Sequence, residues 1–281
     1  MAAPARHGAQ VILPTRSTMP HRERWPIALT IAGSDSGGGA GIQADLKTFA
    51  ALRVHGTSAI TCITAQNPRE VRAVQAVRPS ILRAQLEAVC AELPPRAVKT
   101  GMLYSASLIR QVARFRFPEA PPLVVDPVMV ATSGAPLLHP RALRALVRLL
   151  LPRAALITPN IPEAELLLQA PLRSVDELRA GARTLYRRFG CAVLLKGGHL
   201  RGVSQAVDLY YDGRTELLLL APRVRNLHTH GTGCTYAAAI TAHLARGLTL
   251  PRAVAAAKQF ITRALARSYR AAHHDVLHVA L

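Results

Sequence analysis

Short apolar runs and longer amphipathic segments alternate along the chain from Trp25 onward. Continuous apolar runs of this length are typical of strands buried on both faces, and apolar residues spaced three or four positions apart are typical of helices packed on one side. The runs that predict strands cover residues 27–31, 58–63, 97–101, 123–126, 154–158 and 191–196. The segments that predict helices cover residues 40–52, 79–93, 105–115, 140–150, 161–168 and 174–189.

The pattern changes in the last third of the chain. Residues 206–211 and 215–220 are joined by Asp212 and Gly213, a pair that favours a tight turn, so they predict a β-hairpin. Two helices close the chain, at 233–246 and 250–269. Repeated strand–helix units predict an α/β fold with a mainly parallel sheet covered by helices on both faces.

The chain shows no internal repeat and no linker, so we expect one domain over residues 25–281. Residues 1–24 lack periodicity and the apolar core of a secretory signal, and we expect a disordered extension there. A transit peptide and a true start at Met19 remain alternatives. Apolar stretches fall short of the roughly 20 residues that a membrane span needs. The four cysteines are widely spaced without a zinc-binding pattern, which favours a reducing compartment and a cytoplasmic location.

The formal net charge of +19 raises the possibility of a nucleic-acid-binding protein without catalysis. The basic residues are scattered over many predicted helices, however, and only 4% of residues are aromatic, which is few for base stacking. We therefore expect no nucleic-acid partner. Only four of the 35 basic residues are lysine, and Lys47, Lys99 and Lys196 stand beside glycine-rich or strand-end stretches. Lysine there indicates a need for a compact point charge.

A glycine-rich segment, AGSDSGGGAGIQADLKTF at 32–49, joins the first predicted strand to the first helix. Glycines let a ligand approach the backbone, and a helix start offers free N–H groups. The spacing matches neither the P-loop nor the dinucleotide-binding fingerprint. A flexible turn is the alternative interpretation.

Polar side chains follow several later strands. Asp126 ends one strand, Asn160 and Glu163 lie at the start of the helix after the next, and Lys196 ends a third before two glycines. Oxygen ligands of this kind suit Mg²⁺ held through water, and a lysine there suits nucleotide phosphates. Helix capping by Asn160, a surface Glu163 and a solvated Lys196 are the alternatives. Gln66, after the second strand, offers an amide that suits a pyrimidine edge, although a surface role is also open.

The segment HTHGTGCTYAAAI, at 228–240, places Gly231, Thr232, Gly233 and Cys234 at a predicted helix start. Backbone amides and the helix dipole would form an anion hole there, suited to a transferred phosphoryl group. The same field would lower the pKa of the Cys234 thiol and let it act as a general base. A small structural residue at the helix start is the alternative for Cys234.

These segments, with TAQN, VKTGML, DPVMVATSG, TPNIPEAELL and LLKGGH, follow one order over residues 25–269. Together they resemble the hydroxymethylpyrimidine/phosphomethylpyrimidine kinases of thiamine biosynthesis, in the ribokinase superfamily. The resemblance implies a ribokinase-like three-layer fold and two successive ATP-dependent phosphorylations of 4-amino-5-hydroxymethyl-2-methylpyrimidine. It also implies a homodimer. A pyridoxal kinase of the same fold is the second hypothesis.

The resemblance assigns a role to each site residue. Cys234 would be the base, and the amides of 231–234 the anion hole. Lys196 would contact ATP phosphates. Residues implied to organise Mg²⁺, with contact to the nucleotide, are Asp126, Asn160 and Glu163. Residues implied to bind or shape the pyrimidine pocket are Gln66, Gly33, Asp45, Met102 and Val128. Two segments depart from the family pattern: Ser36 stands where a proline is usual, and QNPREV after Gln66 is unusually charged. Both affect the segment expected to cover the substrate.

Overall fold

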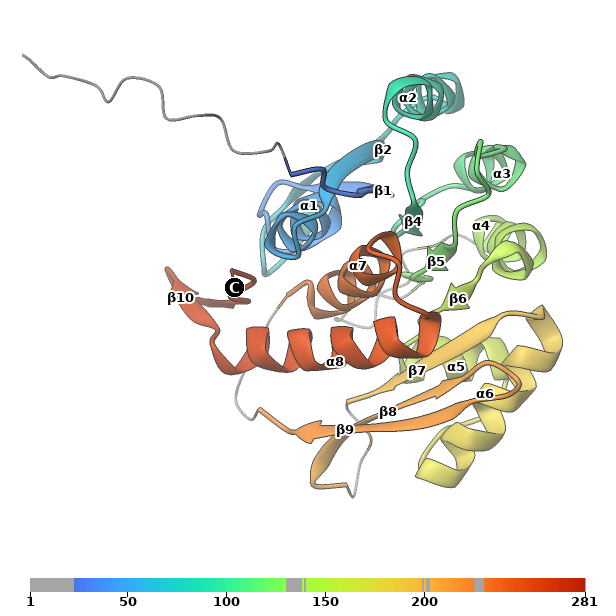
Figure 1. The fold of residues 1–281 in the computed structure, drawn as a ribbon, viewed down its shortest axis with the longest axis vertical. Helices are drawn as coiled ribbons and strands as arrows, with labels where there is room; N and C mark the ends of the chain where they lie inside the picture. The colour runs from blue at the N-terminus through green and yellow to red at the C-terminus, as the bar shows by residue number, and fades with distance from the viewer. Residues whose placement is uncertain are drawn as a thin grey trace, which may run out of the picture.

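The computed structural model describes residues 23–129, 138, 140–198, 200, 203–224 and 230–280, which form three layers around a central sheet (Figure 1). The strands of that sheet run in the order β3-β2-β1-β4-β5-β6-β7-β8-β9. Their bounds are β1 Ile27–Asp35, β2 His55–Gln66, β3 Val71–Ala76, β4 Ala97–Thr100, β5 Leu123–Val125, β6 Leu156–Ile157, β7 Ala192–Gly197, β8 Gln205–Tyr211 and β9 Glu216–Pro222. The six consecutive strands β2-β1-β4-β5-β6-β7 pair in parallel. At the two edges, β3 pairs antiparallel with β2, and the β8–β9 hairpin pairs antiparallel with β7. The predicted mainly parallel sheet is confirmed.

Helices cover both faces of the sheet, as Figure 1 shows. On one face lie α1 (Gly41–Ala51), α7 (Thr232–Ala245) and α8 (Leu250–Ala266), which share one buried apolar cluster with the sheet. On the other face a second cluster is formed with α2 Pro79–Glu92, α3 Ala106–Arg114, α4 Pro140–Ala145, α5 Ile161–Leu168 and α6 Val175–Phe189. Successive residues of β1 serve the two clusters in turn, because neighbouring side chains of a strand point to opposite faces.

Local sequence signals fix several element ends. The Ser174 hydroxyl accepts a hydrogen bond from the Glu177 amide at the start of α6, and the Glu177 carboxylate accepts one from the Ser174 amide, which is a capping box. Gly190 ends the same helix in the left-handed conformation, at φ +70°. In the β8–β9 turn, the Asp212 carboxylate accepts from two backbone amides next to Gly213, which has φ +91°. These signals explain why the predicted bounds there agree with the structure.

Three parts of the fold differ from the sequence-based expectation. β3 was not predicted, because nearly all its side chains are exposed and it shows no apolar alternation. Helix 140–150 consists of α4 followed by a π-helical turn at Leu146–Leu150. The last helix ends at Ala266, and the short strands β10 (Tyr269–Ala271) and β11 (His274–Val276) form a hairpin after it.

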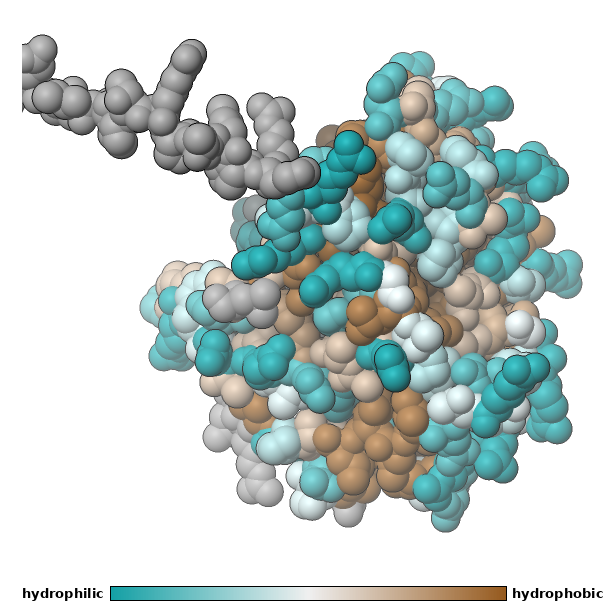
Figure 2. Space-filling model, viewed as in Figure 1, coloured by the Kyte–Doolittle hydropathy of each residue, from teal (hydrophilic) through white to brown (hydrophobic). Residues whose placement is uncertain are grey.

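The surface of the described residues is mixed in character. Figure 2 shows hydrophilic side chains spread over much of the visible face, with an apolar patch below α8 in the region of the β8–β9 hairpin. Leu217 and Leu219 of β9 are partly buried and pack toward this side of the sheet. Among the helices that the structure describes, none has the length and apolarity to cross a membrane. The predicted disordered extension lies almost wholly in residues 1–22, outside the described part of the chain.

Candidate active site

The carboxyl ends of the parallel strands and the first turns of α1 and α7 meet at one edge of the sheet. Gln66 ends β2, Asp126 follows β5, Asn160 follows β6 and Lys196 lies in β7. Asn160 and Lys196 form a parallel β-bridge, which places them side by side. This edge is where ligands bind in open α/β sheets. The structure therefore gathers residues that the sequence keeps far apart.

The two glycine-rich segments touch through their backbones. Gly231 has φ +84°, and a Cβ added to it would lie 1.8 Å from the carbonyl oxygen of Gly39. A Cβ on Gly39 would in turn lie 3.1 Å from Cδ2 of His230. Only glycine fits at position 231, both for its conformation and for this approach. The glycine-rich turn before α1 and the start of α7 therefore form one continuous surface.

The first turn of α7 directs backbone amides into this surface. The first intrahelical bond runs from the Thr235 amide to the Gly231 carbonyl, at 2.9 Å, so the amides of 232–234 precede it. A Cβ on Gly233 would lie 3.2 Å from Nζ of Lys196 and 3.7 Å from Oδ2 of Asp126. Amides, helix dipole and a lysine cation thus share one small space, which suits an anion such as a phosphoryl group.

Lys196 is held by the carboxylate of Asp126. Its Nζ donates to Oδ1 of Asp126 at 2.7 Å, and Thr158 Oγ1 donates to the same oxygen at 3.0 Å. The side chain of Lys196 is 14% exposed. Burial alone would lower the pKa of Lys196, but the charges of Asp126 and Glu163 raise it overall. Lys196 is therefore a fixed cation that retains a solvent-facing side.

Asn160 and Glu163 form a capping box at the start of α5. Oδ1 of Asn160 accepts from the Glu163 amide at 2.9 Å, and the Glu163 carboxylate accepts from the Asn160 amide at 3.0 Å and the Met129 amide at 2.9 Å. Burial raises the pKa of Glu163, with the Lys196 charge opposing it. Both oxygens of Glu163 are thus already bonded.

The side chains of Asp126, Asn160 and Glu163 could hold Mg²⁺ only through bridging water molecules. No group of three or more His, Cys, Asp or Glu able to hold a metal ion directly occurs among the described residues. Asp126 and Glu163 share the neighbouring Lys196, so these three side chains together offer two acidic groups and one cation. Mg²⁺ commonly keeps several of its waters and takes one or two carboxylates.

Cys234 is partly exposed, and its sulfur accepts a hydrogen bond from the backbone amide of Gly41. Burial raises the pKa of the Cys234 thiol; the nearby Lys99 charge opposes the rise and the Asp45 charge adds to it. The expectation of a lowered pKa is wrong, because removal of the sulfur from water outweighs the field of the helix start. Cys234 as a residue nevertheless keeps part of its surface exposed.

Gly33 and Met102 lie together beside Cys62. A Cβ on Gly33 would lie 2.8 Å from Sγ of Cys62 and 3.0 Å from Cε of Met102. The carbonyl of Met102 accepts from Thr61 Oγ1 at 2.7 Å, which fixes its position. Val128 has φ +42°, a strained conformation for a β-branched residue, of the kind that concentrates at functional sites.

Asp45 lies behind the site rather than on its surface. Its side chain is fully buried in an ion pair with Lys99, and Thr30 Oγ1 donates to it at 2.6 Å. Any influence of Asp45 on a bound pyrimidine therefore passes through its neighbours.

Comparison with known proteins identifies the family of the chain. The family model described as phosphomethylpyrimidine kinase matches residues 35–278. The chain belongs to the phosphomethylpyrimidine kinase family. The hydroxymethylpyrimidine/phosphomethylpyrimidine kinase of Synechococcus elongatus is 49% identical over 243 residues, which are 86% of this chain and 92% of that protein.

Two solved structures place the fold in the same group of kinases. The phosphomethylpyrimidine kinase of Clostridium difficile has a TM-score of 0.76 at 43% identity, covering 85% of this chain and 99% of that one. The pyridoxal kinase of Staphylococcus aureus, in complex with AMP-PCP and pyridoxal, has a TM-score of 0.81 at 34% identity, covering 92% and 94%. The predicted ribokinase-like three-layer fold is thereby confirmed.

Two residues of this phosphomethylpyrimidine kinase site were not predicted, Asp35 and His230. The Asp35 carboxylate accepts from the amides of Gly37 and Ala40, each at 2.8 Å, and lies 3.1 Å from Nε2 of His230. Burial alone would raise the pKa of Asp35, but hydrogen bonds from His230 and the amides lower it overall. His230 Nε2 also lies 2.9 Å from the side-chain nitrogen of Gln66. The available signal was position: Asp35 lies two residues before Gly37, the first of three consecutive glycines, and His230 directly precedes Gly231.

Ser36, which replaces the proline usual in the family, ties the glycine-rich turn to the end of β2. Its hydroxyl donates to the Gln66 carbonyl at 2.6 Å and accepts from the Gln66 amide at 2.8 Å. A proline has no side-chain hydroxyl and would make neither bond. The departure from the family pattern therefore adds a direct link to Gln66.

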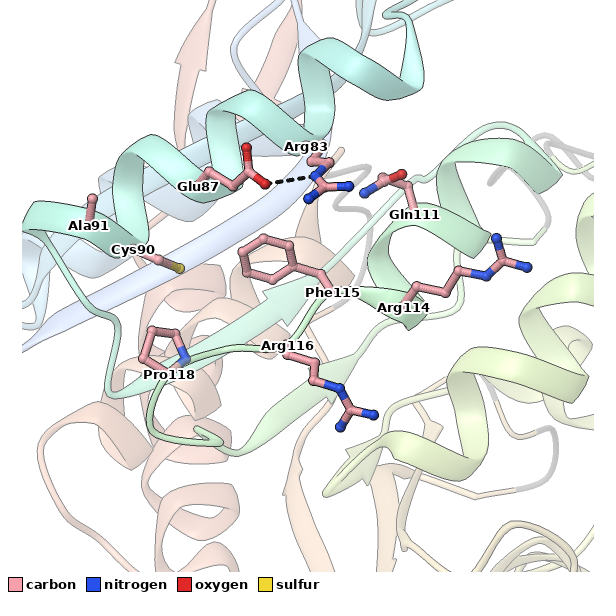
Figure 3. Close-up of a pocket in the computed structure, with 9 residues that line it drawn as sticks. All are labelled: Arg83, Glu87, Cys90, Ala91, Gln111, Arg114, Phe115, Arg116 and Pro118. Atoms are coloured by element: carbon pink, nitrogen blue, oxygen red, sulfur yellow. Dashed lines mark hydrogen bonds and ion pairs between the residues drawn. The ribbon is translucent and has the colours of Figure 1, made fainter.

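A hollow of about 620 Å³ between α2 and α3 contains none of these residues (Figure 3). Arg83 pairs with Glu87 at 2.7 Å on its rim, and Phe115 points toward the space between the helices. The guanidinium groups of Arg114 and Arg116 point away from that ring. The charged groups therefore do not converge on a common point, unlike those at the edge of the sheet.

Proposed function

We propose that this chain transfers the γ-phosphoryl group of ATP to 4-amino-5-hydroxymethyl-2-methylpyrimidine and then to the resulting monophosphate, in thiamine biosynthesis. The observation that carries the proposal is that a lysine, a carboxylate and a cysteine lie together at the first turn of α7. The open backbone of Gly233 lies against Lys196 and Asp126, and Cys234 follows directly. A phosphoryl group seated there is within reach of amide donors, a cation and a sulfur base.

The first transfer needs a base. The hydroxymethyl oxygen attacks the γ-phosphorus in line, the bond to the β–γ bridging oxygen breaks, and ADP leaves. The hydroxyl proton passes to the thiolate of Cys234, while the 231–234 amides hold the phosphoryl oxygens and Lys196 holds the nucleotide phosphates. Gly33, Met102 and Val128 would shape the pyrimidine pocket, with Gln66 at its edge.

The second transfer makes a different demand. Its nucleophile is a phosphate oxygen, which is already ionised near neutral pH because the second pKa of a phosphate monoester is about 6. No proton has to be removed, so Cys234 is needed mainly for the first transfer. The anion hole and Lys196 are needed for both.

A magnesium ion, when bound, would neutralise charge on the phosphates. Asp126, Asn160 and Glu163 would hold it through water, because Glu163 and Asn160 are already engaged in the capping box. The protein groups would orient those waters, and Lys196 would balance the carboxylates.

Phosphorus NMR of the products tests the proposal. Cys234→Ala is expected to reduce formation of the monophosphate by at least about 100-fold and to reduce conversion of monophosphate to diphosphate far less. Cys90→Ser, a thiol half-buried on α2, is the control and should change neither step. Equal loss of both steps in Cys234→Ala would contradict the base role and indicate damage to the anion hole. Loss of neither would remove the sulfur from the mechanism.

The pH dependence adds a second test. Because burial raises the pKa of Cys234, the rate of the first step should rise with pH through the range 7 to 9 as thiolate forms. A Cys234→Asp variant supplies a base that is ionised throughout this range, and its profile should be flat.

Pyridoxal is the second candidate substrate, because a structural relative binds it. A coupled ATP assay with each alcohol separates the two: pyridoxal kinase activity alone, without turnover of the pyrimidine, would overturn the main proposal.

The assembly and location are proposals as well. Ile63 and Val71, on the β2–β3 pair, are 57% and 48% exposed, which supports a homodimer that covers them. Sedimentation velocity tests this, and a monomer at micromolar concentration would contradict it. All four cysteines are unpaired, which supports the cytoplasm as the location.

A further inference from the structure

A fully buried ion pair lies beneath the site, between Lys99 of β4 and Asp45 of α1. Lys99 Nζ donates to the two carboxylate oxygens at 2.9 and 2.7 Å, and both side chains are 0% exposed. Thr30, whose register partner on β4 is Lys99, donates to the same carboxylate at 2.6 Å. The Asp45 charge raises the pKa of Lys99 against the opposing effect of burial, so Lys99 is held as a cation. Burial raises the pKa of Asp45, and the Lys99 charge and the hydrogen bonds from Lys99 and Thr30 oppose that rise.

The Lys99 ammonium group fills the space under the end of β4. A Cβ on Gly101 would lie 3.1 Å from Nζ of Lys99 and 3.0 Å from Cβ of Ala32. Gly101 directly precedes Met102, so the lysine lies just behind the wall of the proposed pyrimidine pocket. The Lys99 side chain is fully excluded from solvent, so its field is weakly screened.

Two routes connect this pair to Cys234. The first is mechanical: Asp45 lies one helical turn after Gly41, whose amide donates to the Cys234 sulfur. Fixing Asp45 thus fixes the first turn of α1 against α7. The second is electrostatic: Lys99 is the nearby cation whose charge favours a thiolate at Cys234, whereas Asp45 and Asp126 disfavour it.

We propose that Lys99 is a positioning residue for the base of the first phosphoryl transfer: with Asp45 it fixes the Gly41 amide against the Cys234 sulfur, and its charge supports the thiolate. The sulfur can accept the hydroxyl proton only when it is in this thiolate form. The catalytic part of the proposal rests on the proposed function, but the effect on the sulfur is a property of the protein without substrate.

Removing the cation of the pair and removing its anion should shift the pKa of Cys234 in opposite directions. Lys99→Met removes the cation that favours the thiolate, so the pKa of Cys234 rises. Asp45→Asn keeps the shape but leaves the Lys99 cation uncompensated, so the pKa of Cys234 falls. If the pair were merely structural, both variants would loosen the site and would shift the pKa of Cys234 in the same direction.

The experiment is the pH dependence of iodoacetamide alkylation, followed by mass spectrometry of the Cys234 peptide in the ligand-free protein. We expect the midpoint to rise by about one pH unit in Lys99→Met and to fall by about one in Asp45→Asn. Asp208→Asn, which breaks the second buried lysine–aspartate pair, is the matched control and should leave the midpoint unchanged. The peptide of Cys191, buried at the start of β7, serves as an internal control.

Shifts of the same sign in both variants, or no shift in either, would overturn the proposal. If Lys99→Met does not fold, Asp45→Asn still tests the direction, and a rise or no change there refutes it. Activity measurements test the catalytic part of the proposal. In Lys99→Met, the loss in the rate of the first transfer should become smaller toward high pH, and KM for ATP should not change. If the sulfur titrates as expected but the first transfer does not follow it, the proposed base, and not the pair, is wrong.

Discussion

Among the lysine and arginine ion pairs that the structure describes, those with a buried cation are made by lysine and those with an exposed cation by arginine. In the described part of the chain, three lysines pair with aspartates at 2.7 Å, and these lysine side chains are 0%, 14% and 10% exposed. The arginine pairs have guanidinium side chains that are 39% to 77% exposed. The fourth lysine, Lys47, donates to the carbonyl of Gly38 in the glycine-rich turn, at 2.9 Å.

The difference follows from the shape of the two cations. An ammonium group is compact, and its three donors suit a narrow buried slot, whereas the planar guanidinium fork needs more room and more acceptors. A chain that otherwise uses arginine almost exclusively places three of its four lysines where the charge is enclosed, while Lys47 is exposed. The placement of Lys99 and Lys196 beside strand ends was therefore a usable signal, and Lys258 is a further example that the sequence did not single out.

The largest effect is expected at Lys258, whose Nζ donates to Asp208 at 2.7 Å while Asp208 accepts the Gly197 amide at 3.0 Å. Lys258→Met leaves a buried carboxylate without its partner and should lower the free energy of unfolding by about 3–5 kcal/mol. Chemical denaturation measures this. The double variant with Asp208→Asn should recover part of the loss, and a loss in the double variant equal to the sum of the single losses would contradict the pairing.

Replacing lysine by arginine at the site sharpens the comparison next. Lys196→Arg keeps the charge but brings a larger group against Gly233, so kcat/KM should fall by about 100-fold with folding retained. Steady-state kinetics and thermal unfolding measure the two properties. Arg179→Lys on the surface is the matched exchange and should leave both unchanged; near-normal activity of Lys196→Arg would show that shape does not matter.

His243 is a buried base without an acidic partner among the residues that the structure describes, and its surroundings lower its pKa. It is 8% exposed, and burial, followed by the charges of Arg246 and Arg263, lowers its pKa. The unfolded chain therefore binds a proton more readily below about pH 6.5, so stability should fall as the pH drops through that range. Denaturant midpoints at pH 7.5 and 5.5 should differ by less than the effect of Lys258→Met. His243→Gln should reduce the difference, and an unchanged slope would exclude this histidine.

The smallest effect is expected on the surface. Arg83 and Glu87 pair at 2.7 Å, but their side chains are 64% and 52% exposed, so water already solvates both charges. Arg83→Ala should leave the denaturant midpoint within experimental error at any salt concentration. A clear loss of stability would erase the distinction between the two kinds of pair.

The periodicity of the chain was enough to predict the parallel sheet and nearly all its helices, because buried strands and amphipathic helices carry strong patterns. It missed β3, which is exposed, and the β10–β11 hairpin, whose strands are three residues each. Motif positions pointed to Cys234 and Lys196 as site residues, and the family resemblance added Gly33. It did not pair Lys99 with Asp45, 54 residues apart, or bring His230 to Gln66, 164 residues apart. It also gave the wrong direction for the Cys234 pKa, since dehydration of a side chain depends on the packed structure.

The backbone contact between Gly231 and Gly39 has a practical meaning for redesign. The turn that leads into α1 and the turn that leads into α7 meet with no space between them, so inserting a residue in either one pushes on the other. Altered acceptor preference should therefore be sought by exchanging both turns together, as a matched set from one relative. Swapping only one is expected to yield a folded protein whose two half-sites no longer meet.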